Sequence, residues 1–130
     1  MYAAFVRFFD KAPVALEPRI EGTDESNEHW IKQKVSFAAG YGGERIVAYL
    51  YLPRNAAPHY QTVIQIGGVS TFYRLTTETD ASIFGWAYAE YLLRGGRAVL
   101  LPLWKGSYER SDGFDPLHGS AAGFRDHAIQ

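Results

Sequence analysis

The stretch Gln61–Ser70 holds the residues best suited to chemistry that relies on the backbone. An apolar run of valine and isoleucine ends there at Gly67-Gly68. Glycine permits unusual dihedral angles and lets a ligand or another backbone approach closely. A buried strand that ends on a glycine pair therefore presents bare backbone N–H groups at one point in space. Catalysis at such a point would also need a nucleophile, and no matching one is obvious in the chain.

Ser70 is the candidate nucleophile nearest to this point, in the segment Gly68-Val69-Ser70-Thr71-Phe72. It follows a strand, as the serine of a G-x-S-x-G nucleophile elbow does. The glycines of an elbow let strand and helix backbones nearly touch, and Phe72 would place a side chain in that gap. The next helix is also expected later, near Asp80. We therefore interpret Ser70 as a loop hydroxyl and Ser120, in a wrongly spaced GSAAG, as a helix N-cap.

Metal and phosphate sites are not predicted. The four histidines are His29, His59, His118 and His127. None has a metal-ligand spacing on a helix face, and the acidic run over residues 21–28 lacks the spacing of a calcium loop. His118 or His127 near Asp115 or Asp126 could mimic a base and its orienting acid, but surface or capping roles are favoured. No glycine-rich phosphate motif occurs.

Aromatic residues in the second half of the chain could line a substrate cleft. Trp104, Tyr108 and Phe114 lie in or after an apolar strand, in a loop that would fold back over the sheet ends. Ligands of α/β sheets bind there. Packing is the alternative role, and it is favoured for Trp104 over the cleft-wall role. For Tyr108 the two roles are balanced.

Hydrophobic periodicity predicts the elements that position these residues. Residues 30–38 and 45–52 alternate with period two around a glycine-rich turn, which predicts an antiparallel hairpin. Residues 61–66 and 97–104 are continuous apolar runs of the kind found in buried parallel strands. Between them, residues 81–94 have helical spacing, with Phe84, Ala87, Tyr88, Tyr91 and Leu92 on one face, and Gly95-Gly96 ends the helix. Strand, helix and strand predict a right-handed βαβ unit.

Composition limits the classes of function. The chain has 130 residues, which allows one domain at most. It has a net charge of −1 with scattered Lys and Arg, so no nucleic-acid surface is predicted. No apolar run is long enough to span a membrane, and we interpret no segment as a signal peptide, which favours a soluble, cytoplasmic protein. The chain has no cysteine, so thiol chemistry is excluded. The chain has nine tyrosines; those within predicted strands, Tyr49 and Tyr51, alternate with other residues, and the tyrosines do not form one stripe, which favours packing over a carbohydrate-binding face.

Residues 27–130 resemble the N-terminal part of an α/β-hydrolase domain. The resemblance rests on VSFAAGYGGERIVAYLYLPRN followed by QTVIQIGG, then RAVLLPLWKGSYERSDG and FRDHAIQ. These segments are similar to dienelactone-hydrolase and acetyl-xylan-esterase-like domains, close to the prolyl-oligopeptidase-type serine hydrolases. The resemblance implies an α/β fold in which the hairpin is followed by the parallel βαβ unit. It also implies the strand order 1-2-4-3, which leaves Gln61–Ile66 as an exposed edge strand.

The resemblance also implies a role for the glycine pair. In this family one oxyanion-hole donor is a backbone N–H directly after the third strand, and a second follows the nucleophile. The first donor falls at Val69, with Gly68 beside it. The family's His-Gly form is replaced here by Ile66-Gly67-Gly68. The elbow serine, the acid and the base are expected after Gln130, so the chain is interpreted as a catalytically incomplete fragment.

The expected function follows from this resemblance. The whole domain would cleave carboxylic esters or peptides through an acyl-enzyme, with a small-molecule ester or peptide as substrate and no cofactor. Residues 1–29 would be an extension or linker, and residues 30–130 the truncated hydrolase portion. The exposed strand Gln61–Ile66 would favour self-association. The alternative is a non-catalytic α/β binding or interaction module.

Overall fold

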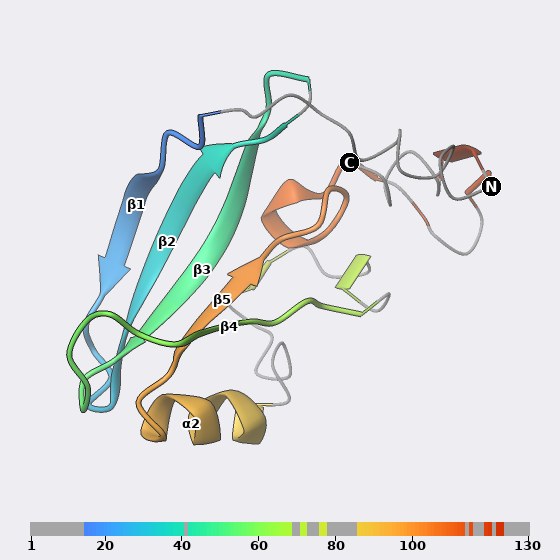
Figure 1. Ribbon diagram of the computed structural model, residues 1–130. Coiled ribbons are helices and arrows are strands. Elements are labelled where there is room, and N and C mark those ends of the chain that lie inside the picture. Colours follow the sequence, from blue (N-terminus) through green and yellow to red (C-terminus); the bar gives the residue numbers. More distant parts are fainter. Residues whose placement is uncertain are drawn as a thin grey trace, which may run out of the picture.

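The fold is described from a computed structural model, which defines residues 15–40, 42–68, 71–72, 76–77, 86–113, 115, 119–120 and 122–123. It is a mixed α/β structure with one sheet and one main helix in these residues (Figure 1). The elements are β1 (Arg19–Asp24), β2 (Trp30–Ala38), β3 (Arg45–Pro53), β4 (Thr62–Ile64), α2 (Trp86–Arg94), β5 (Ala98–Pro102) and the short 3₁₀ helix η2 (Tyr108–Arg110).

The hairpin β2–β3 forms as the alternating pattern predicts. The two strands pair antiparallel from Trp30↔Pro53 to Ala38↔Arg45. Gly42 and Gly43 have φ values of 59° and 66° in the turn, a conformation that is costly for residues with a Cβ. The glycine density of this segment was therefore a correct turn signal, and the expected hairpin is confirmed.

The predicted strand order needs correction. The sheet has five strands in the order β1-β2-β3-β5-β4, so 1-2-4-3 is wrong as a description of it. The prediction omitted β1, which pairs antiparallel with β2. All six residues of its sequence, RIEGTD, are exposed. Only Ile20 among them is apolar, so the sequence has no apolar pattern that would mark a strand. Among the other four strands, β5 lies between β3 and β4, antiparallel to β3 and parallel to β4.

Strand β1 lies in the segment before β2. We expected residues 1–29 to be an extension or linker, and residues 19–24 within them are exposed but form a strand of the sheet. The guanidinium of Arg45 donates to the Glu17 carbonyl at 2.8 Å, which fixes the approach to this strand. Residues 1–14 lie outside the described part of the chain. The division of the chain at residue 29 stays a prediction.

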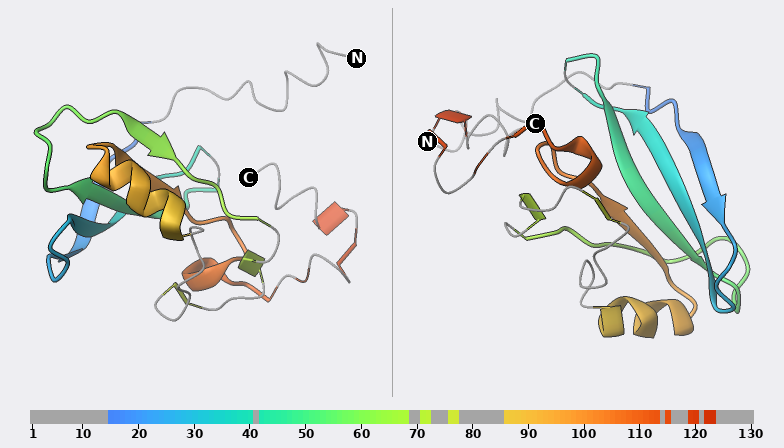
Figure 2. Two further views of the ribbon diagram at one scale, coloured as in Figure 1. Left: turned by 90° about the horizontal axis from the view of Figure 1, so that it is seen from below. Right: turned by 180° about the vertical axis from the view of Figure 1, so that it is seen from behind.

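One face of the sheet holds the hydrophobic core. Helix α2 packs on this face over β3 and β5, and Figure 2 shows it on one side of the strands. The core residues of the strands, the helix and the following loop are Trp30, Tyr49, Tyr51, Val99, Leu101, Ala89, Leu92, Leu93, Leu103 and Tyr108. Alternation along β3 and β5 brings Tyr49, Tyr51, Val99 and Leu101 to this side.

The predicted buried face of the helix is wrong in part. Leu92 is buried as expected, but Tyr88 and Tyr91 are 61% and 71% exposed. Ala89 and Leu93 are buried in their place. Apolar side chains of this helix occur around most of its circumference, so their spacing did not decide which side faces the sheet. The small Ala89 side chain allows the helix to approach the sheet closely. Tyr88 and Tyr91 lie on the exposed side of the helix, where their hydroxyl groups stay in water. The start expected near Asp80 and residue Phe84 lie outside the described residues.

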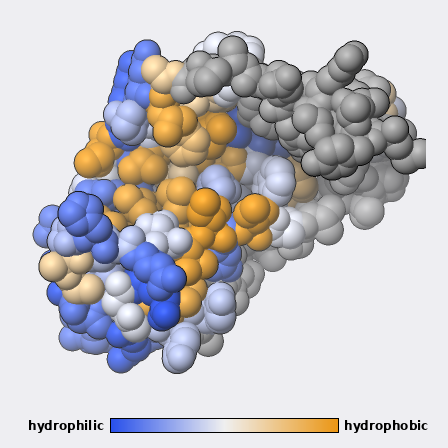
Figure 3. All heavy atoms as spheres, viewed as in Figure 1, coloured by the Kyte–Doolittle hydropathy of each residue, from blue (hydrophilic) through white to orange (hydrophobic). Residues whose placement is uncertain are grey.

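Strand β4 is shorter and more exposed than its continuous apolar run predicted. It covers only Thr62–Ile64, and Ile64 and the following Ile66 are each 60% exposed. The expected edge position of this strand is confirmed, because β4 ends the sheet order. Apolar residues gather over the strands on the face seen in Figure 3. The edge position explains the exposure, because β4 has a neighbour on one side only among the described strands.

Candidate functional site

The carboxyl ends of the parallel strands β4 and β5 form the candidate site. The two parallel strands pair from Thr62↔Ala98 to Ile64↔Leu100, so the chain leaves both strands at the same end of the sheet. We call this end, beyond the last residues of β4 and β5, the carboxyl edge. The N–H of Gln65 donates to the Leu100 carbonyl at 2.9 Å, which extends the pairing toward the glycine pair. Ligands of open α/β sheets bind outside this edge. The segments that follow β4 and β5 therefore contain the candidate site.

Close packing around Gly67 gives the glycine pair a structural reason. A Cβ at Gly67 would lie 2.6 Å from the Cγ2 methyl of Thr71, whereas a Cβ at Gly68 would meet nothing within 4 Å. Thr71 cannot move freely, because its N–H and hydroxyl donate to the Gly68 carbonyl at 3.0 and 2.8 Å. The Nε1–H of Trp104 donates to the Gly67 carbonyl at 2.9 Å. The backbone after β4 is thus held tightly at its first turn.

A test of this packing compares alanine at the two glycines. Gly67→Ala is expected to destabilise the fold by about 1–3 kcal/mol because the new methyl overpacks the turn. Thr71→Ser removes the clashing methyl and keeps the hydroxyl, so the double variant should recover most of the loss. Gly68→Ala is the matched control and should change stability by less than about 1 kcal/mol. Equal effects at both glycines, measured by urea unfolding, would show that the close contact is unimportant.

Several predicted site residues lie outside the described part of the chain. These are Val69, Ser70, Phe114, His118 and His127. The oxyanion donor at Val69 and the loop role of Ser70 therefore stay predictions. Gly68 is described, and its carbonyl is engaged by Thr71. The hydroxyl of Ser120 accepts from the N–H of Gly123 at 3.0 Å, which is the geometry of an N-cap.

The two described histidines lie away from this edge. His29 lies at the end of the sheet opposite the carboxyl edge. It directly precedes β2, and the first residue of β2 pairs with the last residue of β3. Its imidazole is 3.3 Å from the Glu28 carboxylate. His59 lies before β4, on the amino side of that strand. Neither reaches the glycine pair, and the described residues contain no group of three His, Cys, Asp or Glu side chains that could hold a metal ion.

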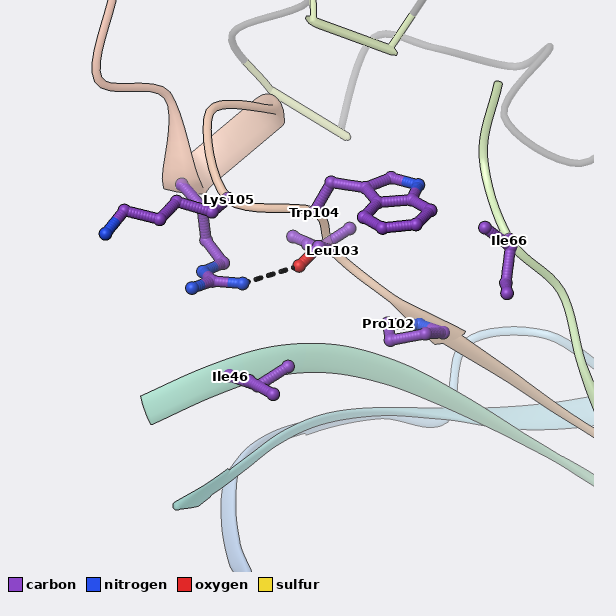
Figure 4. Close-up of a pocket in the computed structure, with 7 residues that line it drawn as sticks. Ile46, Ile66, Pro102, Leu103, Trp104 and Lys105 are labelled. Atoms are coloured by element: carbon purple, nitrogen blue, oxygen red, sulfur yellow. Dashed lines mark hydrogen bonds between the residues drawn. The ribbon is translucent and has the colours of Figure 1, made fainter. Parts of the chain in front are cut away.

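An apolar pocket of about 190 Å³ lies at the carboxyl edge, beside Trp104 (Figure 4). The residues that line it are Ile46, Ile66, Pro102, Leu103, Trp104, Lys105 and Arg110. Figure 4 shows the Trp104 ring turned toward Ile66, with Pro102 and Ile46 on the other wall. Ile66 directly precedes Gly67, so the pocket adjoins the glycine pair. Of these residues, only Trp104 was predicted from the sequence as a cleft residue. Ile46 of β3 and Arg110 of η2 reach this place only through the tertiary structure.

Tyr108, the second predicted cleft residue, has a different position. Its side chain is 3% exposed and packs in the core on the other face of the sheet, and it is not among the residues that line the pocket. Its φ of 46° is in the left-handed region, which a bulky residue rarely adopts. Surrounding structure must hold a residue in such a conformation.

One carboxylate and two cations lie at the rim of the pocket. Glu44, from the hairpin turn, contacts the ammonium of Lys105 at 2.6 Å and the guanidinium of Arg110 at 3.4 Å. The hydrogen bond from Lys105 is the main reason that the pKa of Glu44 is lowered. Arg110 also donates to the Leu103 carbonyl at 2.8 Å, drawn as a dashed line in Figure 4. These contacts connect the hairpin turn to the loop after β5.

Glu109 makes a second network, between the loop after β5 and residue 77. Its Oε1 accepts from the N–H and the hydroxyl of Thr77 at 2.9 and 2.6 Å, and from the hydroxyl of Tyr49 at 3.3 Å. Partial burial tends to raise the pKa of Glu109, but the hydrogen bonds from Thr77 and Tyr49 outweigh it, and the pKa is lowered from 4.5. Hydrogen bonds to a charged acceptor are the stronger kind.

The pH dependence of stability reports on this network. A carboxylate whose pKa is lowered by folding stabilises the folded state above its unfolded pKa, and this contribution is lost as the pH falls through the folded value. We expect Glu109→Gln to lower the unfolding free energy by about 1 kcal/mol at pH 7, because glutamine keeps an acceptor but not the charge. The difference from wild type should shrink below pH 4.5. A difference that stays constant down to pH 3 in urea unfolding would contradict this account.

Comparisons with known proteins give distant structural similarity and no match to a family. No family model and no curated protein matches the chain. Among solved structures, a glucuronoyl esterase from Solibacter usitatus is similar, with a TM-score of 0.49 and 13% sequence identity. The similarity covers 90% of this chain and 41% of that one, so this chain spans less than half the length of the esterase. A similarity at this level assigns neither a fold nor an activity. No helix in the described residues is long and apolar enough to cross a membrane.

Proposed function

We propose that this chain is the N-terminal part of an α/β-hydrolase domain, and that the whole domain cleaves carboxylic esters or peptides through an acyl-enzyme. The observation that carries the proposal is the carboxyl edge of β4 and β5, where a tightly held glycine pair adjoins an apolar pocket. The antiparallel hairpin followed by the parallel pair β4–β5 supports it. The nucleophilic serine, the acid and the base are supplied by sequence after Gln130.

The residues of this chain would contribute binding and charge stabilisation. When the serine oxygen attacks the substrate carbonyl carbon, the carbonyl oxygen becomes negative, and the backbone N–H of Val69 donates to it, with Gly68 beside it. Donors that are fixed in advance stabilise such a charge without reorganisation. Trp104 holds the Gly67 carbonyl, so it limits movement of the backbone that leads to Val69. The reaction needs no cofactor.

The pocket suggests the size of one group of the substrate. An engineered apolar cavity of about 150 Å³ accepts benzene. A pocket of about 190 Å³ lined by Ile46, Ile66 and Pro102 would therefore hold an apolar group of about phenyl size. Esters with an aryl or short branched alkyl group are the substrates that fit this reasoning.

The test is active-site labelling of the natural full-length protein with a fluorophosphonate. We expect one labelled serine, located by peptide mapping in a G-x-S-x-G motif after residue 130, and hydrolysis of aryl esters that labelling abolishes. Label at Ser70 would overturn the assignment of the nucleophile. A folded full-length protein that neither reacts with the probe nor hydrolyses esters would favour the non-catalytic binding module.

We also propose that the 130-residue chain self-associates through the exposed edge at β4. Ile64 is 60% exposed on a strand that ends the sheet, which is the kind of edge that pairs with another chain. Ile64→Lys should shift the chain toward monomer in sedimentation velocity, because a charge blocks edge pairing. Ile20→Lys is the matched control, since Ile20 is 63% exposed on the opposite edge strand. Equal sedimentation of the wild type and both variants would contradict the proposal.

A further inference from the structure

A polar hollow of about 290 Å³ lies over the outer strands β1 and β2 and reaches β3. The residues that line this lysine hollow are Gly22, Thr23, Asp24, Lys32, Lys34 and Tyr49. Tyr49 belongs to the core cluster, so the hollow opens on the face of the sheet that carries α2. Strand β1 ends the sheet on the side away from β4 (Figure 1). The lysine hollow and the apolar pocket share no residue, so they are separate sites.

Two ammonium groups belong to this hollow. Lys32 and Lys34 are two residues apart on β2, so their side chains lie on the same face of the sheet. The ammonium of Lys32 lies 4.6 Å from the centroid of the Tyr49 ring, which is the geometry of a cation–π contact. Among the residues that the structure describes, neither lysine is in an ion pair. The two like charges repel each other, and an anion between them would be attracted by both.

Gly22 keeps the hollow open. It pairs with Lys34 across the two strands, next to an irregularity in their register. Gly22 is not one of the glycines with a positive φ, and a Cβ there would meet nothing within 4 Å. Neither the backbone conformation nor a close neighbour therefore requires glycine, and glycine weakens a strand interior. What glycine provides at this position is free space in front of the lysines.

Asp24 is the acidic residue of the hollow, and its carboxylate is engaged in the adjoining turn. Its Oδ1 accepts from the N–H of Ser26 at 2.9 Å. This hydrogen bond is the main reason that the pKa of Asp24 is lowered, and the positive charge of Lys32 contributes less. The hollow thus carries two positive charges and one negative charge, which leaves it net positive. A ligand that is attracted to this charge is an anion.

We propose that the lysine hollow binds the phosphate group of a small phosphate ester, with the ammonium groups of Lys32 and Lys34 as donors. A phosphate monoester has three strong acceptor oxygens and a charge between about −1.5 and −2 at pH 7, so it can engage both lysines at once. The hollow has about 290 Å³, against about 30 Å³ for one water molecule in the liquid. This leaves room for a phosphate and for carbon atoms attached to it. The inference does not depend on the proposed hydrolase activity.

The first test is calorimetric titration of the natural full-length protein with glycerol 3-phosphate at low ionic strength. We expect saturable binding that weakens as salt is added, because salt screens the charges of an open site. Lys32→Gln and Lys34→Gln should each weaken binding by about 3- to 10-fold. Arg94→Gln is the matched control, since it removes a positive charge that lies outside the hollow, and its affinity should stay within about twofold. Inorganic phosphate should bind more weakly than the ester, and glycerol should not bind.

Two variants that keep both lysines test the same site independently, in case a lysine variant fails to fold. Gly22→Thr should raise the urea midpoint of unfolding, because a β-branched residue suits a strand better than glycine. Its side chain fills the hollow, so it should weaken binding of glycerol 3-phosphate by about tenfold or more. Asp24→Asn removes the negative charge and should tighten binding by about two- to fivefold.

Three results would overturn the proposal. The first is a wild-type protein that shows no saturable binding of glycerol 3-phosphate. The second is unchanged affinity in Gly22→Thr together with unchanged affinity in the folded lysine variants. The third is an equal loss of affinity in Arg94→Gln and the lysine variants, which would mean that the phosphate responds to the total charge of the protein and not to the hollow.

Discussion

Val69→Pro is expected to lower kcat of the full-length protein for an aryl ester by about 100- to 1,000-fold. Proline has no backbone N–H, so this change removes the proposed donor and nothing else from the hydrogen-bonding capacity of the residue. Loss of one oxyanion-hole donor has an effect of about this size. KM should change little, because the ground-state carbonyl oxygen carries little charge.

The control for this change is Val69→Ala, which shortens the side chain and keeps the N–H. Its kcat should stay within a few-fold of wild type. Thermal unfolding of both variants gives the folded fraction by which each rate is divided. A Val69→Pro protein that is folded and fully active would refute the donor role of this residue. Equal losses of kcat in both variants would show that the side chain, and not the N–H, is what matters.

Tyr108→Ala is expected to lower the free energy of unfolding by about 3–5 kcal/mol. Tyr108 is 3% exposed, and its ring packs in the core cluster. Truncation of a buried aromatic side chain to alanine removes that burial and leaves a cavity, with losses in this range. The loss is a large part of the stability of a small domain, and urea unfolding at pH 7 measures it.

A second substitution at the same position separates packing from backbone strain. Because φ of Tyr108 is 46°, alanine there keeps the steric cost of the left-handed conformation and glycine does not. Tyr108→Gly should therefore be more stable than Tyr108→Ala by about 1 kcal/mol. Leu103, which is also buried but not in this conformation, is the control, and there alanine should be the more stable. The same order at both positions would mean that Tyr108 is not strained.

The sequence predicted the elements whose signals lie within a few residues. The hairpin β2–β3 follows from alternation and from the glycines of its turn, which adopt the positive φ that glycine allows. The parallel pair β4–β5 follows from two apolar runs separated by a helix. The edge position of β4 came from the family resemblance, and the structure agrees with it. In contrast, β1 has no apolar pattern, and its hydrogen bonds to β2 are the reason it is a strand.

For the candidate site, the sequence determined the glycine pair at the end of β4 and the aromatic residue Trp104 at the end of β5. Only the tertiary structure decided that the indole holds the Gly67 carbonyl and that Glu109 binds Thr77. The physical reason is one of range. Dihedral preferences and hydrophobic periodicity act between near neighbours, whereas Glu109 and Thr77 are 32 residues apart and meet only because the sheet brings their loops together.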